Sequence, residues 1–138
     1  MVESTELRAE SAFAQCLRVQ EEAAHVGFDW NDVHGPIAKI IEETDELKRA
    51  IDAHDTELAK QELGDVLLSV VNVARHMNVD PERILNDATR RFAARFERMR
   101  GMLDGQGVSL CDCSLEEMDA AWEISKRRDT GHNNVDGK

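Results

Sequence analysis

The 138-residue sequence has no tyrosine, only two prolines and few aromatic residues, which argues against a β-sandwich and favours helices. It also lacks a long apolar run, because Ser69, Asn72, Arg75 and His76 interrupt the richest stretch, residues 66–77. That stretch is too short and too polar to span a bilayer, and the polar N-terminus does not resemble a secretion signal. We therefore expect a soluble, cytoplasmic protein that does not bind a membrane.

Basic residues are few, with 17 Lys and Arg against 28 Asp and Glu, for a formal net charge of -11. This balance argues against nucleic-acid binding, which needs a basic surface. An anionic small molecule still fits if a metal cation lies between it and the protein. The odd cysteine count of three favours reduced thiols. Cys111 and Cys113 have no second Cys/His pair at zinc-finger spacing, so we expect ordinary thiols in a loop.

Apolar residues at helical spacing predict five helices. Pro36 suits the first turn of the second helix, Asp80 followed by Pro81 opens the fourth, and a capping box begins the fifth at Ser114. Short connections between the second, third and fourth helices favour an all-α, antiparallel helical bundle. We expect one domain, residues 1–128, and a disordered tail, residues 129–138. Four of the predicted helices cover residues 4–25, 36–53, 55–77 and 114–126. The fourth along the chain begins at residue 80 and ends at a loop marked by Gly101, Gly105 and Gly107.

The third predicted helix is apolar on nearly every side, so we expect it to be buried. One narrow line of polar residues runs along it at alternating steps of three and four, which places them on a single face. Buried carboxylates must be paired or bind a metal. The pattern therefore predicts a cavity or an internal site lined by Glu62, Asp65, Ser69, Asn72 and His76, with His76 at its far end as a structural residue.

The second predicted helix carries Glu42, Glu43 and Glu46, and Lys39 shares the face of Glu43 and Glu46. Like charges three or four residues apart repel one another, but a divalent cation would make such a cluster favourable. Carboxylate oxygens are the ligands that Mg²⁺ prefers. Either acidic motif alone is typical of a solvated face, whereas both together on antiparallel helices predict a metal site. The absence of Glu-x-x-His argues against a di-iron bundle.

The run Glu42-Glu43-x-x-Glu46 followed by Glu62-Leu63-Gly64-Asp65 resembles the EExxE…ExxD motif of the MazG family. The resemblance spans roughly residues 12–128 and is to the second, C-terminal module of two-module members. This sequence contains one such module, either as a standalone protein or as a fragment of a two-module protein. The resemblance implies the fold of the all-α NTP pyrophosphatases. It also implies hydrolysis of nucleoside triphosphates between the α- and β-phosphates, which yields a monophosphate and pyrophosphate. Further matching segments are residues 26–30, 63–76, 90–96 and 115–122.

Carried over by motif, the resemblance implies Mg²⁺, or alternatively Mn²⁺, held by Glu43, Glu46, Glu62 and Asp65. Glu42 would support these ligands or join them. Catalysis would involve Glu42, Glu43 and Glu46, with one carboxylate, Glu42 or Glu46, orienting or deprotonating the attacking water.

Basic and polar residues should complete the substrate site. Arg91 and Arg95 have guanidinium groups that suit phosphate oxygens, although they could simply solvate a helix edge. Lys60 is a weaker candidate, and Asn72 could bond the substrate or a metal-bound water. Trp122 resembles a family tryptophan near the nucleotide; the alternative is a hydrophobic anchor for the fifth helix.

Family members usually associate, so we expect a homodimer or a higher homo-oligomer. Two other functions stay open. One is a non-catalytic acidic helical module for dimerisation or regulation, against which the complete set of ligands argues. The other is a narrower pyrophosphatase for dUTP, dCTP or phosphoribosyl-ATP, since nothing in the sequence indicates which base is recognised.

Overall fold

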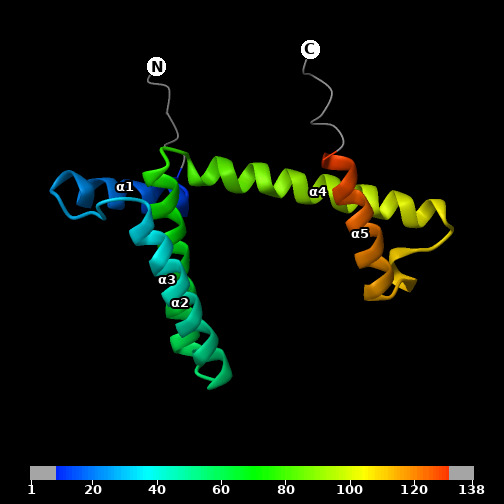
Figure 1. Ribbon diagram of the computed structural model, residues 1–138, viewed down its shortest axis with the longest axis horizontal. Helices are drawn as coiled ribbons and strands as arrows, with labels where there is room; N and C mark the ends of the chain where they lie inside the picture. Colours follow the sequence, from blue (N-terminus) through cyan, green and yellow to red (C-terminus); the bar gives the residue numbers. More distant parts are fainter. Residues whose placement is uncertain (1–8, 131–138) are drawn as a thin grey trace, which may run out of the picture. The chain divides into compact units, whose positions relative to one another are not determined.

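The computed structural model describes residues 9–130, and its regular elements in that range are all helical (Figure 1). This confirms the predicted all-α class. The chain divides into two compact units, the first ending at Ile84 and the second beginning at Leu85, inside one long helix. The single domain predicted over residues 1–128 stays a prediction. The elements are α1 (Ala12–His25), α2 (His34–Asp52), α3 (Thr56–His76), α4 (Pro81–Gly105), the 3-10 turn η1 (Leu110–Asp112) and α5 (Leu115–Thr130).

Capping side chains set the starts of the helices, as the sequence predicts. Asp55 Oδ1 accepts a hydrogen bond from Leu58 N at 3.1 Å, so Asp55 caps α3. Ser114 Oγ accepts from Glu117 N at 3.2 Å, while Glu117 Oε1 accepts from Ser114 N at 3.4 Å. This reciprocal pair is the predicted capping box of α5.

Several predicted boundaries were wrong by a turn or more. Helix α1 begins at Ala12, where the Ser11 hydroxyl accepts from Ala14 N at 3.1 Å; residues 1–8 lie outside the described range. Helix α4 runs through Gly101 to Gly105, because buried Met99 and Leu103 hold this turn against α5. Helix α5 reaches residue 130, so residues 129 and 130 of the predicted tail are helical, and residues 131–138 lie outside the described range.

In the first unit α2 and α3 run side by side as an antiparallel hairpin, and α1 packs against α3 (Figure 1). The chain reverses at His54, whose φ of 56° lies in the left-handed region. Small buried side chains, Ala50 on α2 and Val71 and Ala74 on α3, let the helices approach closely. The hairpin brings the middle of α2 opposite the N-terminal half of α3.

The prediction that α3 is buried was wrong for the single chain. Leu63 and Leu67 are each 51% exposed and Val70 is 41% exposed, because α1 and α2, the described helices that pack on α3, leave this face uncovered. Spaced four and three residues apart, they form one apolar line. We call Leu63, Leu67 and Val70 the exposed α3 stripe.

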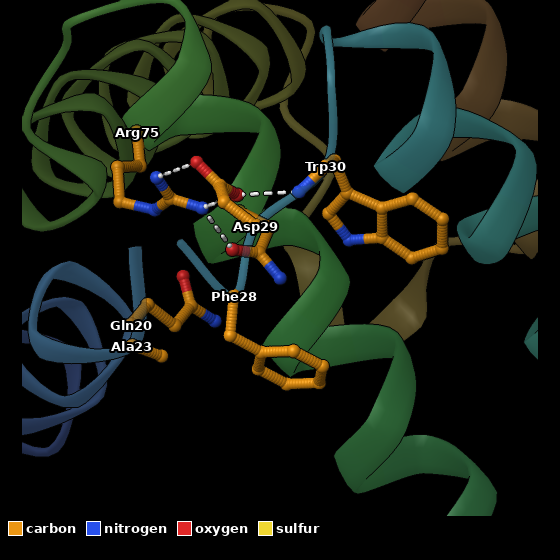
Figure 2. A pocket seen from close by; sticks show the side chains of 7 residues that line it. Gln20, Ala23, Phe28, Asp29, Trp30 and Arg75 are labelled. Carbon is orange, nitrogen blue, oxygen red and sulfur yellow. Dashed lines mark hydrogen bonds and ion pairs between the residues drawn. The ribbon is translucent and has the colours of Figure 1, made fainter. Parts of the chain in front are cut away.

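The connection between α1 and α2 is held to the end of α3 by Asp29 (Figure 2). Asp29 Oδ2 accepts a hydrogen bond from Arg75 Nη1 at 2.8 Å, and Asp29 Oδ1 lies 3.1 Å from His76 Nε2. The hydrogen bonds from Arg75, more than any other contact, hold the pKa of Asp29 well below its usual range. His76 therefore has the structural role that the sequence predicted.

In the second unit α5 packs against the C-terminal half of α4. Its core consists of Met99, Leu103 and Ala121, with Phe96 and Trp122 partly buried against it. Among residues 9–130, no helix is both long and apolar enough to cross a membrane.

Candidate metal centre

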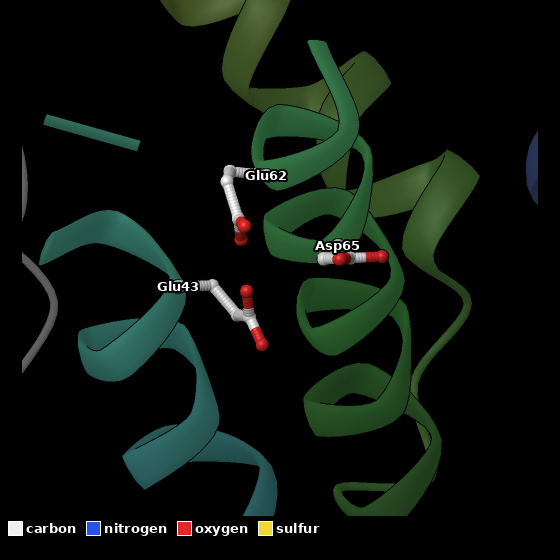
Figure 3. Close-up of side chains that lie close together, drawn as sticks. All are labelled: Glu43, Glu62 and Asp65. Atoms are coloured by element: carbon white, nitrogen blue, oxygen red, sulfur yellow. The ribbon is translucent and has the colours of Figure 1, made fainter. Parts of the chain in front are cut away.

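Three carboxylates meet where α2 faces α3: Glu43, Glu62 and Asp65 (Figure 3). Each offers an oxygen, and these atoms lie within 4.8 Å of one another. Glu43 is 5% exposed, Glu62 is half-buried and Asp65 is open to solvent. The structure thus joins the two acidic motifs that the sequence singled out. We call these three residues the carboxylate cluster.

The neighbouring Glu43 carboxyl is the main cause that raises the pKa of Glu62 to about 7, through a hydrogen bond between the two groups. Desolvation and the negative charge of Glu46 raise it further. The pKa of Glu43 is lowered, first by the same hydrogen bond and then by Lys39. The pair therefore holds one proton over a range in which isolated carboxyls have lost theirs.

Lys39 lies one turn before Glu43 on α2, and its Nζ is 2.9 Å from Glu43 Oε1 and 3.4 Å from Glu42 Oε2. Its pKa is raised, chiefly by the hydrogen bond to Glu43. The sequence placed Lys39 on the face of Glu43 and Glu46 without giving it a role. Glu42 is mostly exposed and pairs with Lys39, whereas Glu46 is close enough to affect both Glu43 and Glu62.

A cavity of about 360 Å³ opens beside the cluster, and we call it the carboxylate cavity. Three of the five polar residues predicted to line one cavity do so, namely Asp65, Ser69 and Asn72, whereas Glu62 and His76 are not among its lining residues. Trp30 also lines it, although the sequence identified this side chain only as an aromatic anchor in a loop. The indication for Trp30 in the sequence was weak, because no local pattern shows that its loop folds back over α2 and α3. The lining includes Trp30, Lys39, Glu43, Asp65, Ser69 and Asn72.

The other predicted substrate residues lie apart from this cavity or in the second unit. Lys60 Nζ is 2.9 Å from Glu57 Oε1, on an exposed part of α3. Arg91 is exposed and Arg95 half-buried on α4, and the ring of Trp122 packs 5.1 Å from that of Phe92. Trp122 thus has the anchoring contact that was its alternative interpretation. Roles in substrate binding for Lys60, Arg91, Arg95 and Trp122 stay predictions.

The cluster fits a hard divalent cation. Glu62 Oε2 is buried and has no hydrogen-bond partner, so an oxygen is left to be satisfied by a ligand. The donors are all carboxylate oxygens, as Mg²⁺ or Mn²⁺ prefers, and Asp65 leaves one side open. Fold and site together define an all-α protein with a carboxylate centre on a helical hairpin.

Comparison with known proteins identifies the family. The model of the MazG nucleotide pyrophosphohydrolase domain matches residues 31–99, and the chain belongs to the MazG family. It is 43% identical over 118 residues to the Thermotoga maritima nucleoside triphosphate pyrophosphohydrolase/pyrophosphatase MazG, covering 86% of this chain and 45% of that protein. It is 31% identical over 124 residues to the Escherichia coli K12 nucleoside triphosphate pyrophosphohydrolase, a match that covers 88% of this chain and 47% of that protein. The chain thus spans a little under half the length of these two relatives.

Proposed function

We propose that this chain hydrolyses nucleoside triphosphates between the α- and β-phosphates to a nucleoside monophosphate and pyrophosphate. The carboxylate cluster is the observation that carries the proposal, because it offers a divalent-cation site beside an open cavity. The names of the two relatives support the same reaction.

Glu43, Glu46, Glu62 and Asp65 would hold Mg²⁺ or Mn²⁺. When bound, such a cation neutralises phosphate charge and lowers the pKa of water. Glu46 lies beside Glu43 and Glu62 and could orient the attacking water or take its proton, whereas exposed Glu42 is placed less directly. The Lys39 ammonium on the cavity wall suits a phosphate oxygen.

Asn72, which lines the carboxylate cavity, is the predicted substrate contact best supported by its position. Arg91 and Arg95 on α4 would bind the triphosphate through their guanidinium groups, with Lys60 and Trp122 as further contacts.

The exposed α3 stripe supports a homodimer or a higher homo-oligomer. Its three side chains are each at least 41% exposed on the same helix face, and Ile37 and Ile41, one turn apart on α2, are 40% and 63% exposed. Apolar lines of this kind on neighbouring helices are typical of surfaces that a partner covers. A second copy of the chain is the proposed partner.

The test is pyrophosphate release from each ribo- and deoxyribonucleoside triphosphate, with and without Mg²⁺. We expect cation-dependent turnover that falls at least about a hundredfold in Glu62→Gln and Asp65→Asn, since each removes a charged ligand.

The matched control is Asp45→Asn, which removes a charge from the same acidic run at an exposed position outside the cluster. Its turnover should stay within about twofold of wild type. If the folded protein binds Mg²⁺ yet turns over no nucleotide, the hydrolase proposal is wrong.

A further inference from the structure

A second pocket of about 420 Å³ lies between α1, the loop after it and α3 (Figure 2). The proposed function assigns it no role. It is large enough for a nucleobase with its sugar. We call it the aromatic pocket; its lining includes Gln20, Phe28, Asp29, Trp30, Asn72 and Arg75.

The aromatic pocket adjoins the carboxylate cavity. Trp30 and Asn72 line both, so they stand at the boundary between the two spaces. A molecule whose phosphates lie beside Glu43 and Asp65 would therefore direct its other end past Trp30 and Asn72. For a nucleoside triphosphate, that end is the sugar and the base.

The apolar walls of the pocket suit a flat ring. Phe28 is 82% exposed and Trp30 is 44% exposed, although both line the same pocket. Water is a poor solvent for exposed aromatic faces, and nucleobases of every kind stack on such faces. The loop is not loose, because Asp29, between the two aromatic residues, is bound by Arg75.

The polar groups of the pocket suit a base better than a phosphate. Arg75 donates from both terminal nitrogens to the Asp29 carboxylate, which neutralises its charge. Two buried atoms of the lining residues have no hydrogen-bond partner: the donor Arg75 Nε and the acceptor Gln20 Oε1. A phosphate offers only acceptors at neutral pH, whereas base edges carry donors and acceptors together.

We propose that the aromatic pocket binds the base of the nucleotide, with Phe28 and Trp30 as stacking residues. This rests on the proposed function for the position of the phosphates. It assigns Phe28 to substrate affinity and not to the chemical step.

The test compares Phe28→Ala with Val26→Ala, a truncation in the same loop at a residue that is 80% exposed and does not line the pocket. Pyrophosphate release is measured with nucleoside triphosphates and with ribose 5-triphosphate, which has no base. We expect Phe28→Ala to raise KM about tenfold for the nucleotides and to leave KM for ribose 5-triphosphate unchanged. Val26→Ala should change neither.

A second measurement needs neither a metal nor turnover. In Trp122→Phe, Trp30 is the remaining tryptophan of the two in the sequence. Free nucleosides should quench its fluorescence saturably in EDTA, and Phe28→Ala should weaken that binding about tenfold. The same titration of the wild-type protein shows whether Trp122 itself adds to nucleoside affinity.

The outcomes separate the two proposals. Saturable quenching by nucleosides without turnover of any triphosphate would support the aromatic pocket and contradict the hydrolase. An active enzyme in which Phe28→Ala raises KM equally for nucleotides and for ribose 5-triphosphate, or in which nucleosides do not quench Trp30, would overturn the base site and leave the hydrolase standing.

Discussion

Carboxylate oxygens of Glu43 on α2 and Glu62 on α3 lie within 4.8 Å of each other, and a hydrogen bond between the two groups requires that one of them keeps a proton. Glu43 is held ionised by this bond and by Lys39, so the proton belongs mainly to Glu62, whose pKa is about 7. The metal-free and metal-bound states of the site therefore differ by a proton as well as by a cation.

Without metal, Glu62→Gln should gain stability relative to wild type as the pH rises. Folded wild type binds the Glu62 proton more tightly than the unfolded chain does, and this proton stabilises the fold. The stabilisation is full below pH 4.5 and is lost as the pH approaches 7. The lowered pKa of Glu43 makes wild type less stable as the pH falls, but only below pH 4.5. Thermal unfolding in EDTA from about pH 5 to about pH 7.5 checks this, and a pH-independent difference would contradict it.

Cation affinity should weaken in acid. Because a ligand must lose its proton to bind, the Kd for Mg²⁺ or Mn²⁺ should rise by up to about tenfold per pH unit below pH 7. Calorimetric titration at several pH values, in buffers of different ionisation heat, measures both the Kd and the proton released. Uptake of the cation with no proton release at pH 6 would show that Glu62 is not a ligand.

Asp29→Asn should destabilise the first unit by about 1–2 kcal/mol, because it leaves the partly buried Arg75 guanidinium without its carboxylate. Since the pKa of Asp29 is lowered, this loss should be constant from about pH 5 to about pH 8 and shrink only in stronger acid. Urea unfolding measures it. The control is Asp52→Asn, which breaks the exposed Lys48–Asp52 pair and should cost less than about 0.5 kcal/mol.

Gly35→Ala should displace Trp30. A Cβ at Gly35 would lie 2.8 Å from Trp30 Cδ2 and closer still to Cε3, so the ring must move. We expect a shifted Trp30 emission in the Trp122→Phe background and no gain in stability. By contrast, Gly101→Ala meets nothing within 4 Å and should stabilise α4 by about 0.5–1 kcal/mol, as alanine does in helix interiors. An equal gain in stability from Gly35→Ala and Gly101→Ala would contradict the packing of Trp30 on α2.

Leu67→Glu, in the middle of the exposed α3 stripe, should shift the protein towards a monomer, because it places a charge in the proposed contact between copies. Light scattering after size-exclusion chromatography measures the mass. Leu115→Glu is the control, since Leu115 is 68% exposed at the start of α5, in the second unit. A wild-type protein that is monomeric at micromolar concentration would refute the proposed oligomer.

Much of the local structure was predictable. The capping residues Asp55 and Ser114 act within four residues of their own positions, so the sequence reveals them directly. The boundaries that were wrong depend on distant contacts: Gly101 stays helical because Met99 and Leu103 pack on α5. Intrinsic preference is weaker than such packing.

The site was predictable in kind but not in detail. Periodicity placed Glu62, Asp65, Ser69 and Asn72 on one helix face. It did not show which glutamate of α2 would lie opposite that face. The hairpin buries Glu43 in the cluster and leaves Glu42 mostly exposed, although the two are neighbours in sequence.

By itself the sequence determined the helical class, most of the helix starts and the presence of a carboxylate line, since these follow from residues within one or two turns. The tertiary structure alone decided the meeting of Glu43 with Glu62, the Asp29–Arg75 pair across 46 residues and the place of Trp30 beside the carboxylates. These contacts depend on the register of the α2–α3 hairpin and on the return of the loop over it. Both are set by packing between distant segments.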